Sequence, residues 1–191
     1  MKTIFTLFAL TMSLITCKAQ QVYPLNTYYE DAPNYSYMKD LNNELTPYVG
    51  TYKATYNGNE VILVITKEDK KLLTRSNDRK YYKDVLNVKY TVKDIATGTV
   101  LDDNINPTGP DKKELMSMGT NPPDNNSIDL GYDGTKCGIG WGRITLLKIN
   151  TTQFKWSYYP NSSIFSGNDC PDSKNIKVYL PHTKNLIFTK Q

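Results

Sequence analysis

The sequence predicts a mainly β protein, in which an antiparallel meander of about eight to ten strands closes or rolls into a barrel. Apolar and polar residues alternate with a period of two over most of the chain after Tyr48. Turn signals such as Asn57-Gly58-Asn59 separate the alternating runs, and Asn-Gly tolerates the positive φ of a hairpin turn. A sheet of this many strands tends to close, because exposed edge strands pair with other chains.

Two segments precede the first predicted strand. Residues 20–35 are polar, contain Pro24 and Pro33 and show no sustained period, so we expect an extended arm. Tyr37–Leu45 has apolar residues at helical spacing and is soon followed by a proline, which predicts one short N-terminal helix. A single barrel-like domain is expected over residues 36–191.

The predicted strands follow one another with mostly short connections, as in a meander. Phe154, Trp156 and Tyr158 alternate with polar residues and predict an aromatic face that points inward. In chain order the predicted strands are Thr51–Tyr56, Glu60–Lys67, Leu86–Lys93, Thr99–Asp102, Glu114–Met118, Ser127–Tyr132, Trp141–Ile149, Gln153–Tyr159, Ile176–Leu180 and Leu186–Lys190.

The first residues predict export. Lys2 precedes an uncharged, mostly apolar run of 13 residues, Ile4–Thr16, and Cys17-Lys18-Ala19 supplies a small-x-small cleavage junction. The run is shorter than the about 20 residues that a membrane-spanning helix needs. We therefore expect residues 1–19 to be a signal peptide and the protein to be secreted or periplasmic.

Cys17 offers a second processing route. Leu14-Ile15-Thr16-Cys17 is similar to a lipoprotein processing site, with Thr16 where a smaller residue is usual. Cleavage there would remove residues 1–16 and leave a lipidated Cys17, which would make the protein an outer-membrane lipoprotein. Lipidation of Cys17 is the sole membrane contact that we expect, and both routes stay open.

The two remaining cysteines, Cys137 and Cys170, form an even pair in a chain bound for an oxidising compartment. We expect them to form a disulfide, with two buried free thiols as the alternative. No metal site is predicted, because two cysteines and the distant His182 do not make a ligand cluster.

Composition and motifs argue against several functions. The formal charge is +4, and removal of Lys2 and Lys18 leaves 21 basic against 19 acidic residues, too near balance for a nucleic-acid-binding protein. His182 is the single histidine and lies where a loop is expected, and no Gly-x-Ser-x-Gly motif presents a serine. We therefore predict no catalytic residue, no cofactor and no enzymatic activity.

A basic run over Lys67–Lys83 contains two tyrosines, Tyr81 and Tyr82. Such a run can meet anionic lipid headgroups or acidic polysaccharide at a cell surface. Aspartates and a glutamate dilute its charge, so a solvated hairpin face is the ordinary interpretation.

Several segments resemble known families. Tyr48-Val49-Gly50-Thr51-Tyr52 is similar to the Gly-x-Trp motif at the first strand of lipocalin-like barrels, with Tyr52 in place of Trp. This resemblance implies a lipocalin- or calycin-like barrel. Four segments resemble an uncharacterised family of small exported proteins from Bacteroidota: Cys17–Gln20, Tyr37–Asn42, Gly50-Thr51-Tyr52 and Lys80–Asp84. That second resemblance implies an envelope or secreted location and brings no known activity.

Two classes of function remain open. A hollow barrel would hold a small apolar ligand, because about eight strands enclose room for one. Its candidate lining residues are Tyr52, Val88, Tyr90, Phe154 and Trp156. A filled barrel would instead bind an envelope protein or a polysaccharide through its surface.

Overall fold

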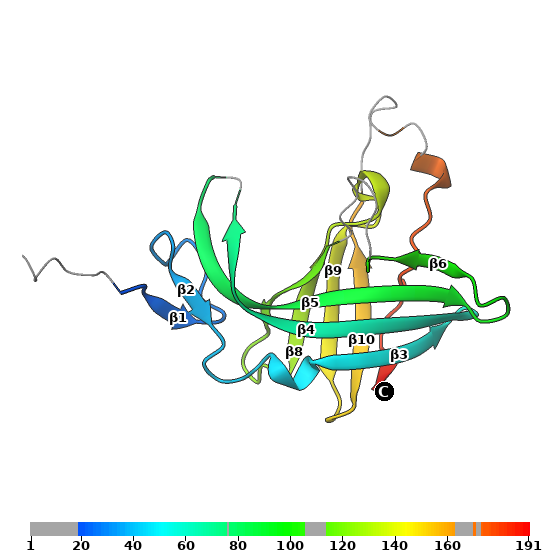
Figure 1. Cartoon of the computed structure of the whole chain (residues 1–191), viewed down its shortest axis with the longest axis horizontal. Coiled ribbons are helices and arrows are strands. Elements are labelled where there is room, and N and C mark those ends of the chain that lie inside the picture. The colour runs from blue at the N-terminus through cyan, green and yellow to red at the C-terminus, as the bar shows by residue number, and fades with distance from the viewer. Residues whose placement is uncertain (1–18, 76, 106–113, 163–169, 171–172) are drawn as a thin grey trace, which may run out of the picture.

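The computed structural model describes residues 19–75, 77–105, 114–162, 170 and 173–191. It confirms the predicted class: eight antiparallel strands form a closed barrel (Figure 1). Strand β5 closes the barrel by pairing with β7, where Asn87 lies opposite Met116. The barrel strands, in their order around it, are β5 (Lys80–Asp94), β4 (Asn59–Thr74), β3 (Gly50–Tyr56), β11 (Leu186–Lys190), β10 (Gln153–Pro160), β9 (Gly142–Lys148), β8 (Ser127–Tyr132) and β7 (Leu115–Thr120).

The hairpin predicted at Asn57-Gly58-Asn59 is present and joins β3 to β4. Asn57 and Gly58 have φ of 48° and 78°, the conformation that Asn-Gly adopts at low cost. The register pairs Tyr56 with Asn59. A further short strand, β6 (Val100–Asp103), pairs antiparallel with β5 on the edge of β5 opposite β4.

The β4–β5 hairpin extends beyond the barrel and bends away from it (Figure 1). The register between the two strands shifts between Glu68 and Lys71, which marks a β-bulge, and Lys70 has a φ of 57° there. Asp84 of β5 accepts a hydrogen bond from the backbone N–H of Lys70 at 2.9 Å, which fixes the bulge. The bulge thus turns the end of the basic run away from the barrel axis.

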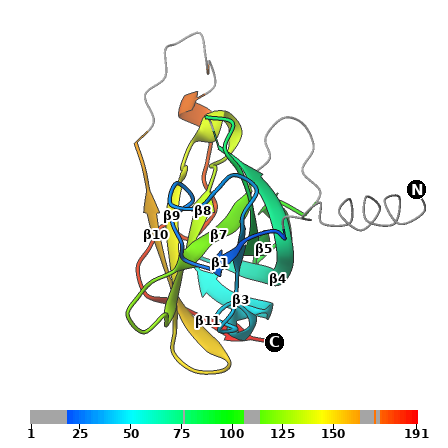
Figure 2. The same cartoon turned by 90° about the vertical axis from the view of Figure 1, so that its left-hand side faces the viewer.

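The N-terminal segment forms a small layer on this bent hairpin. Strand β1 (Val22–Pro24) pairs in parallel with β2 (Tyr37–Lys39), and β2 pairs in parallel with β5. Figure 2 views the molecule from the side of this layer and shows β1 in front of β7 and β8. Asn26, just after β1, donates to the Thr120 hydroxyl at 2.7 Å, so the layer contacts the barrel at β7.

The helix predicted over Tyr37–Leu45 is wrong. Its first three residues are β2, and among the described residues the helical segments are three 3-10 turns, η1 (Thr46–Tyr48), η2 (Lys136–Gly138) and η3 (Ser173–Asn175). The Asp40 carboxylate accepts the backbone N–H groups of Glu44 and Leu45, and Asn43 has a φ of 56°. These local bonds replace the helical ones that the apolar spacing predicted.

The strand predicted at Ile176–Leu180 is also wrong. This segment has no strand pairing, and Leu180 packs into the core at 2% exposure. On the edge of β10 opposite β9, β11 pairs with Gln153–Trp156, and the loop before β11 supplies the next acceptor, because the Tyr158 N–H donates to Thr183 O at 3.0 Å. The last part of β10 therefore has a loop, and not a strand, on the side opposite β9.

The disulfide between Cys137 and Cys170 is confirmed, with Cα atoms 6.2 Å apart. It joins η2 to the long connection after β10. Gly134 has a φ of 87°, and a Cβ there would lie 2.5 Å from the Gly138 carbonyl carbon. A glycine is therefore needed where the chain folds back to carry Cys137.

Candidate functional site

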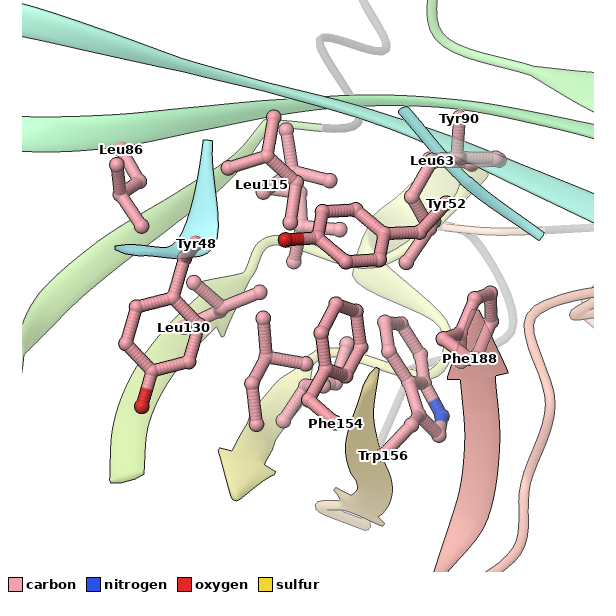
Figure 3. Packing of buried hydrophobic residues seen from close by; sticks show 14 of the residues in the cluster. Tyr48, Tyr52, Leu63, Leu86, Tyr90, Leu115, Leu130, Phe154, Trp156 and Phe188 are labelled. Atoms are coloured by element: carbon pink, nitrogen blue, oxygen red, sulfur yellow. The ribbon is translucent and has the colours of Figure 1, made fainter. Parts of the chain in front are cut away.

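The five candidate lining residues of the barrel interior belong to one hydrophobic core. Tyr52, Val88, Tyr90, Phe154 and Trp156 are each at most 2% exposed. Figure 3 shows how the side chains of this core lie against one another. The structure thus brings the five predicted residues together as neighbours in a packed cluster.

Ring contacts show how closely the aromatic part of this core is packed. The Tyr52 and Phe154 ring centroids are 4.7 Å apart. Phe188 lies 5.5 Å from both Phe154 and Trp156, and the Trp156 indole N–H donates to Pro181 O at 2.9 Å. These rings pack on one another, and the Trp156 N–H has a backbone acceptor. Val88 also lines a separate hollow of about 500 Å³, together with Asn104.

A hollow of about 390 Å³ lies outside the barrel, between the N-terminal layer, the bent hairpin and strands β7 and β8. We call it the outer cleft. Its volume is within the range of about 300 to 1,000 Å³ that small-molecule sites occupy. It is lined by Asn26, Thr27, Tyr28, Tyr29, Met38, Arg75, Tyr81, Lys83, Met118, Gly119, Thr120, Asn121, Pro122 and Asp129.

Lys83 of β5 is the buried cation of the outer cleft. Lys83 is 8% exposed, and its Nζ donates a hydrogen bond to Met118 O at 2.6 Å. Burial, together with the nearby positive charge of Arg75, lowers the pKa of the Lys83 ammonium group to about 8. Lys83 also lines an adjoining hollow of about 200 Å³, so its side chain lies at the boundary between two spaces.

Arg75 stands at the end of the bent hairpin among tyrosines. Its Nε donates to the Tyr81 hydroxyl at 3.1 Å, and its guanidinium carbon is 5.2 Å from the Tyr29 ring centroid. The Tyr29 and Tyr81 rings are stacked, with centroids 5.6 Å apart. Tyr28 lies against Tyr29 at 4.8 Å and is 54% exposed. One face of the cleft is therefore aromatic and carries a positive charge.

The carboxylate that lines the outer cleft is engaged by other groups. Asp129 accepts from the Thr145 hydroxyl at 2.6 Å and lies 3.7 Å from Arg143. Among the residues that the structure describes, neither Lys83 nor Arg75 has an ion-pair partner. The cleft thus combines two cations with no carboxylate bound to either of them.

A buried carboxylate anchors the elements that build the cleft. Asp84 is 1% exposed and accepts hydrogen bonds from the Tyr37 hydroxyl at 2.6 Å and from the Asp40 N–H at 2.9 Å. Burial opposes its ionisation, but these bonds and the one from the Lys70 N–H hold the pKa of the Asp84 carboxyl below its ordinary value. Asp84 therefore ties β2 to the β4–β5 hairpin.

The other residues singled out in the sequence lie away from this cleft. His182 is exposed and its ring meets the edge of Tyr158, with centroids 5.8 Å apart. Cys17 and the rest of the predicted signal lie outside the described residues. Within the described ranges, no group of three or more histidine, cysteine or acidic side chains is placed to hold a metal ion. Nor does any helix in those ranges have the length and apolarity to cross a membrane.

Sequence reasoning identified part of the outer cleft and missed the rest. Arg75, Tyr81 and Lys83 lie in the basic run, whose solvated-face interpretation fails at Lys83 because that residue is buried. Tyr28 and Tyr29 lie in the segment interpreted as an extended arm. No local pattern places that arm on β5, because the parallel pairing of β2 depends on contacts distant in the chain.

Comparison with known proteins identifies a family. Searches of curated proteins and of solved structures found no match for this chain. A family described as "Family of unknown function (DUF6705)" matches residues 1–191. The match spans the barrel, the N-terminal layer and the predicted export signal together. The chain therefore belongs to DUF6705, a family of unknown function.

Proposed function

We propose that this protein is an exported, non-enzymatic binding module that holds a small ligand in the outer cleft and not inside its barrel. The observation that carries the proposal is the buried ammonium group of Lys83, which faces a hollow of about 390 Å³. A buried polar group at the wall of such a hollow is typical of a ligand site. The predicted interior lining, in contrast, is occupied by mutual ring contacts.

The position of the cleft also supports the proposal. Three separate stretches of chain build it, and hydrogen bonds hold them together without filling it. The Thr120 N–H donates to Asn26 Oδ1 at 3.0 Å, and Arg79 at the hairpin end donates to backbone oxygens of the N-terminal layer, including Tyr29 O at 3.2 Å. A site preformed in this way loses little conformational entropy when a ligand binds.

Fragment screening by NMR tests the proposal. A mixture of small polar and aromatic fragments is expected to shift backbone amide signals of Tyr28, Tyr81 and Met118 in the mature protein. Met118→Trp places an indole in the cleft and should abolish these shifts. Leu147→Trp, on the outer face of β9, is the matched control, because Leu147 is 39% exposed and is not a cleft residue. Shifts confined to Tyr52, Phe154 and Trp156, or shifts that survive in Met118→Trp, would refute the outer cleft as the ligand site.

Export is the other part of the proposal and rests on the first residues and on the resemblance to exported Bacteroidota proteins. Intact mass of the protein purified from its native cell distinguishes the two routes. Cleavage after Ala19 gives an unmodified chain that begins at Gln20, whereas lipoprotein processing gives an acylated chain that begins at Cys17. An intracellular, full-length chain would contradict export.

A further inference from the structure

We propose that the ligand of the outer cleft is an acidic sugar, whose carboxylate or phosphate binds between Lys83 and Arg75 while its ring packs on Tyr28. This inference rests on the proposed function and specifies the chemistry of that site. The proposed ligand has two parts, an anionic group and a sugar ring. Each part is carried by different contacts of the described residues.

The two cations of the cleft, Lys83 and Arg75, are the reason to expect an anionic group in the ligand. Arg75 is close enough to Lys83 to disfavour its charged form, and no described carboxylate pairs with either residue. Lys83 Nζ uses one of its three donors on Met118 O. A bound oxyanion would neutralise both cations and accept the unused donors. The one carboxylate that lines the outer cleft, Asp129, is engaged by the Thr145 hydroxyl of β9.

The tyrosines that line the cleft are the reason to expect a sugar ring in the ligand. Tyr28 is more than half exposed although it lines the cleft, and its ring centroid lies 4.8 Å from that of Tyr29. The apolar C–H face of a sugar ring packs well against the electron-rich face of such a tyrosine. Asn121 and Thr27 line the same space and offer polar groups for hydroxyls. The combination of a cationic end and an aromatic wall favours an acidic sugar over a neutral one.

The place of Lys83 in the fold agrees with this role. A charged side chain in a mostly buried position destabilises the protein unless it is paired. Its neighbour in the register, Met38 of β2, shows that an apolar side chain fits this layer. A lysine at this position thus lowers the stability of the fold but provides a positive charge for an anion. Such a loss of stability in exchange for function is typical of a binding residue.

Titration of the folded mature protein tests the inference with three probes, D-glucuronate, glucose 6-phosphate and glucose. Binding is followed by amide shifts of the cleft residues and by calorimetry. We expect the preferred acidic sugar to bind at least about tenfold more tightly than glucose, as one charged hydrogen-bonded contact provides. The two acidic probes distinguish a carboxylate from a phosphate. A higher salt concentration should weaken the binding of the acidic probes and leave the binding of glucose unchanged.

Variants assign the effect to the two cations. Lys83→Met and Arg75→Gln should each reduce binding of the acidic probe about tenfold or more. Lys39→Met is the matched control, because Lys39 is exposed on β2 and lies outside the cleft lining. If Lys83→Met does not fold, Arg75→Gln carries the test. Thermal melting of every variant separates lost binding from lost structure.

The outcomes separate the two levels of the proposal. Glucose binding as tightly as the acidic probes, or acidic probes binding Lys83→Met and Arg75→Gln as they bind the wild type, overturns the acidic sugar. In that result, cleft shifts from the fragment mixture still support the outer cleft as a site. No response to any of the three sugars also overturns this inference, while the fragment screen decides the proposed function independently.

Discussion

Lys83 and Asp84 are adjacent on β5, yet the fold treats their charges in opposite ways. Asp84 is surrounded by three donors, the Tyr37 hydroxyl and two backbone N–H groups, so its charge is satisfied where it is buried. Lys83 is buried almost as deeply and has one described acceptor, Met118 O. Burial destabilises an ionised group, and surrounding hydrogen-bond donors offset that cost for a carboxylate. The two residues therefore predict opposite responses to substitution.

Asp84→Asn should destabilise the protein by about 1 to 3 kcal/mol, because an amide NH₂ would face donors that need an acceptor. Since the folded-state pKa of Asp84 is lowered, its stabilising contribution is complete above the unfolded-state pKa of about 3.9. It disappears as the pH falls through the lower folded-state pKa. Denaturant unfolding between pH 2 and 7 checks this, with Asp31→Asn in an exposed loop as control. Equal acid sensitivity of wild type and Asp84→Asn would contradict the role of Asp84.

Lys83→Met should instead raise the free energy of unfolding at pH 7, by about 3 kcal/mol at most, because it removes a buried cation. The folded-state pKa of Lys83 is lowered to about 8, so the unfolded chain binds more protons from there up to its own pKa of about 10.4. Wild-type stability should therefore rise relative to Lys83→Met as the pH is raised from 8 to 10. The titratable groups that face the two hollows beside Lys83 are Tyr28, Tyr29, Arg75, Tyr81, Glu114, Asp129 and Asp133.

Urea unfolding of the wild type and Lys83→Met at pH 7, 8, 9 and 10 measures this difference. Lys39→Met should follow the wild type at every pH, because its ammonium group is exposed. A Lys83→Met variant that is less stable than the wild type at pH 7 would show that Lys83 stabilises the fold. The destabilising effect of Lys83 would then no longer support a binding role.

At the level of elements, the sequence predicted what depends on local pattern. Alternation and turn residues placed most of the barrel strands, and cysteine count predicted the disulfide. Tyr37–Lys39 was missed because a strand that pairs in parallel with β5 is stabilised by distant contacts, here with Tyr82 and Lys83. The bulge at Lys70 was missed for the same reason, since the Asp84 carboxylate that fixes it lies in the next strand. The outer cleft depends on both features, so its position was not predictable from the sequence.

The disulfide should stabilise the element that it closes. Cys137 and Cys170 are separated by 33 positions, and a loop of that length constrains the unfolded chain by about 3 to 4 kcal/mol on the chain-entropy estimate. The double variant Cys137→Ser, Cys170→Ser should lose that amount in equilibrium unfolding. Reductant should destabilise the wild type to the same level and leave the double variant unchanged. A reductant effect on the double variant would contradict this assignment.

At the scale of the whole molecule, a cluster of buried side chains packs inside the barrel, and the N-terminal layer borders the outer cleft on its outside. The central strands contribute rings that contact one another, as Figure 3 shows for Tyr52, Phe154 and Trp156. A scaffold of this kind holds β5, β7 and β8 in fixed positions. The bent hairpin and the layer of β1 and β2 then define the outer cleft.

The filled interior predicts a large cost for removing a ring. Phe154→Ala should lower the free energy of unfolding by about 3 to 5 kcal/mol, because it deletes packed surface and leaves a cavity. Phe154 is 2% exposed and contacts both Tyr52 and Phe188. Chemical denaturation measures the loss, and Ile187→Ala, an exposed position on β11, should change stability little. A loss below about 1 kcal/mol in Phe154→Ala would indicate a loosely packed or hollow interior.

The central claim is that the ligand lies outside the barrel against Lys83, and a crystal structure of the mature protein with bound D-glucuronate or glucose 6-phosphate tests it most directly. We predict density for the sugar in the outer cleft, with its oxyanion within hydrogen-bond distance of Lys83 Nζ and its ring over Tyr28, and unbroken packing among Tyr52, Phe154 and Trp156. Ligand density among those three core rings, with the outer cleft occupied by water alone, would contradict the claim.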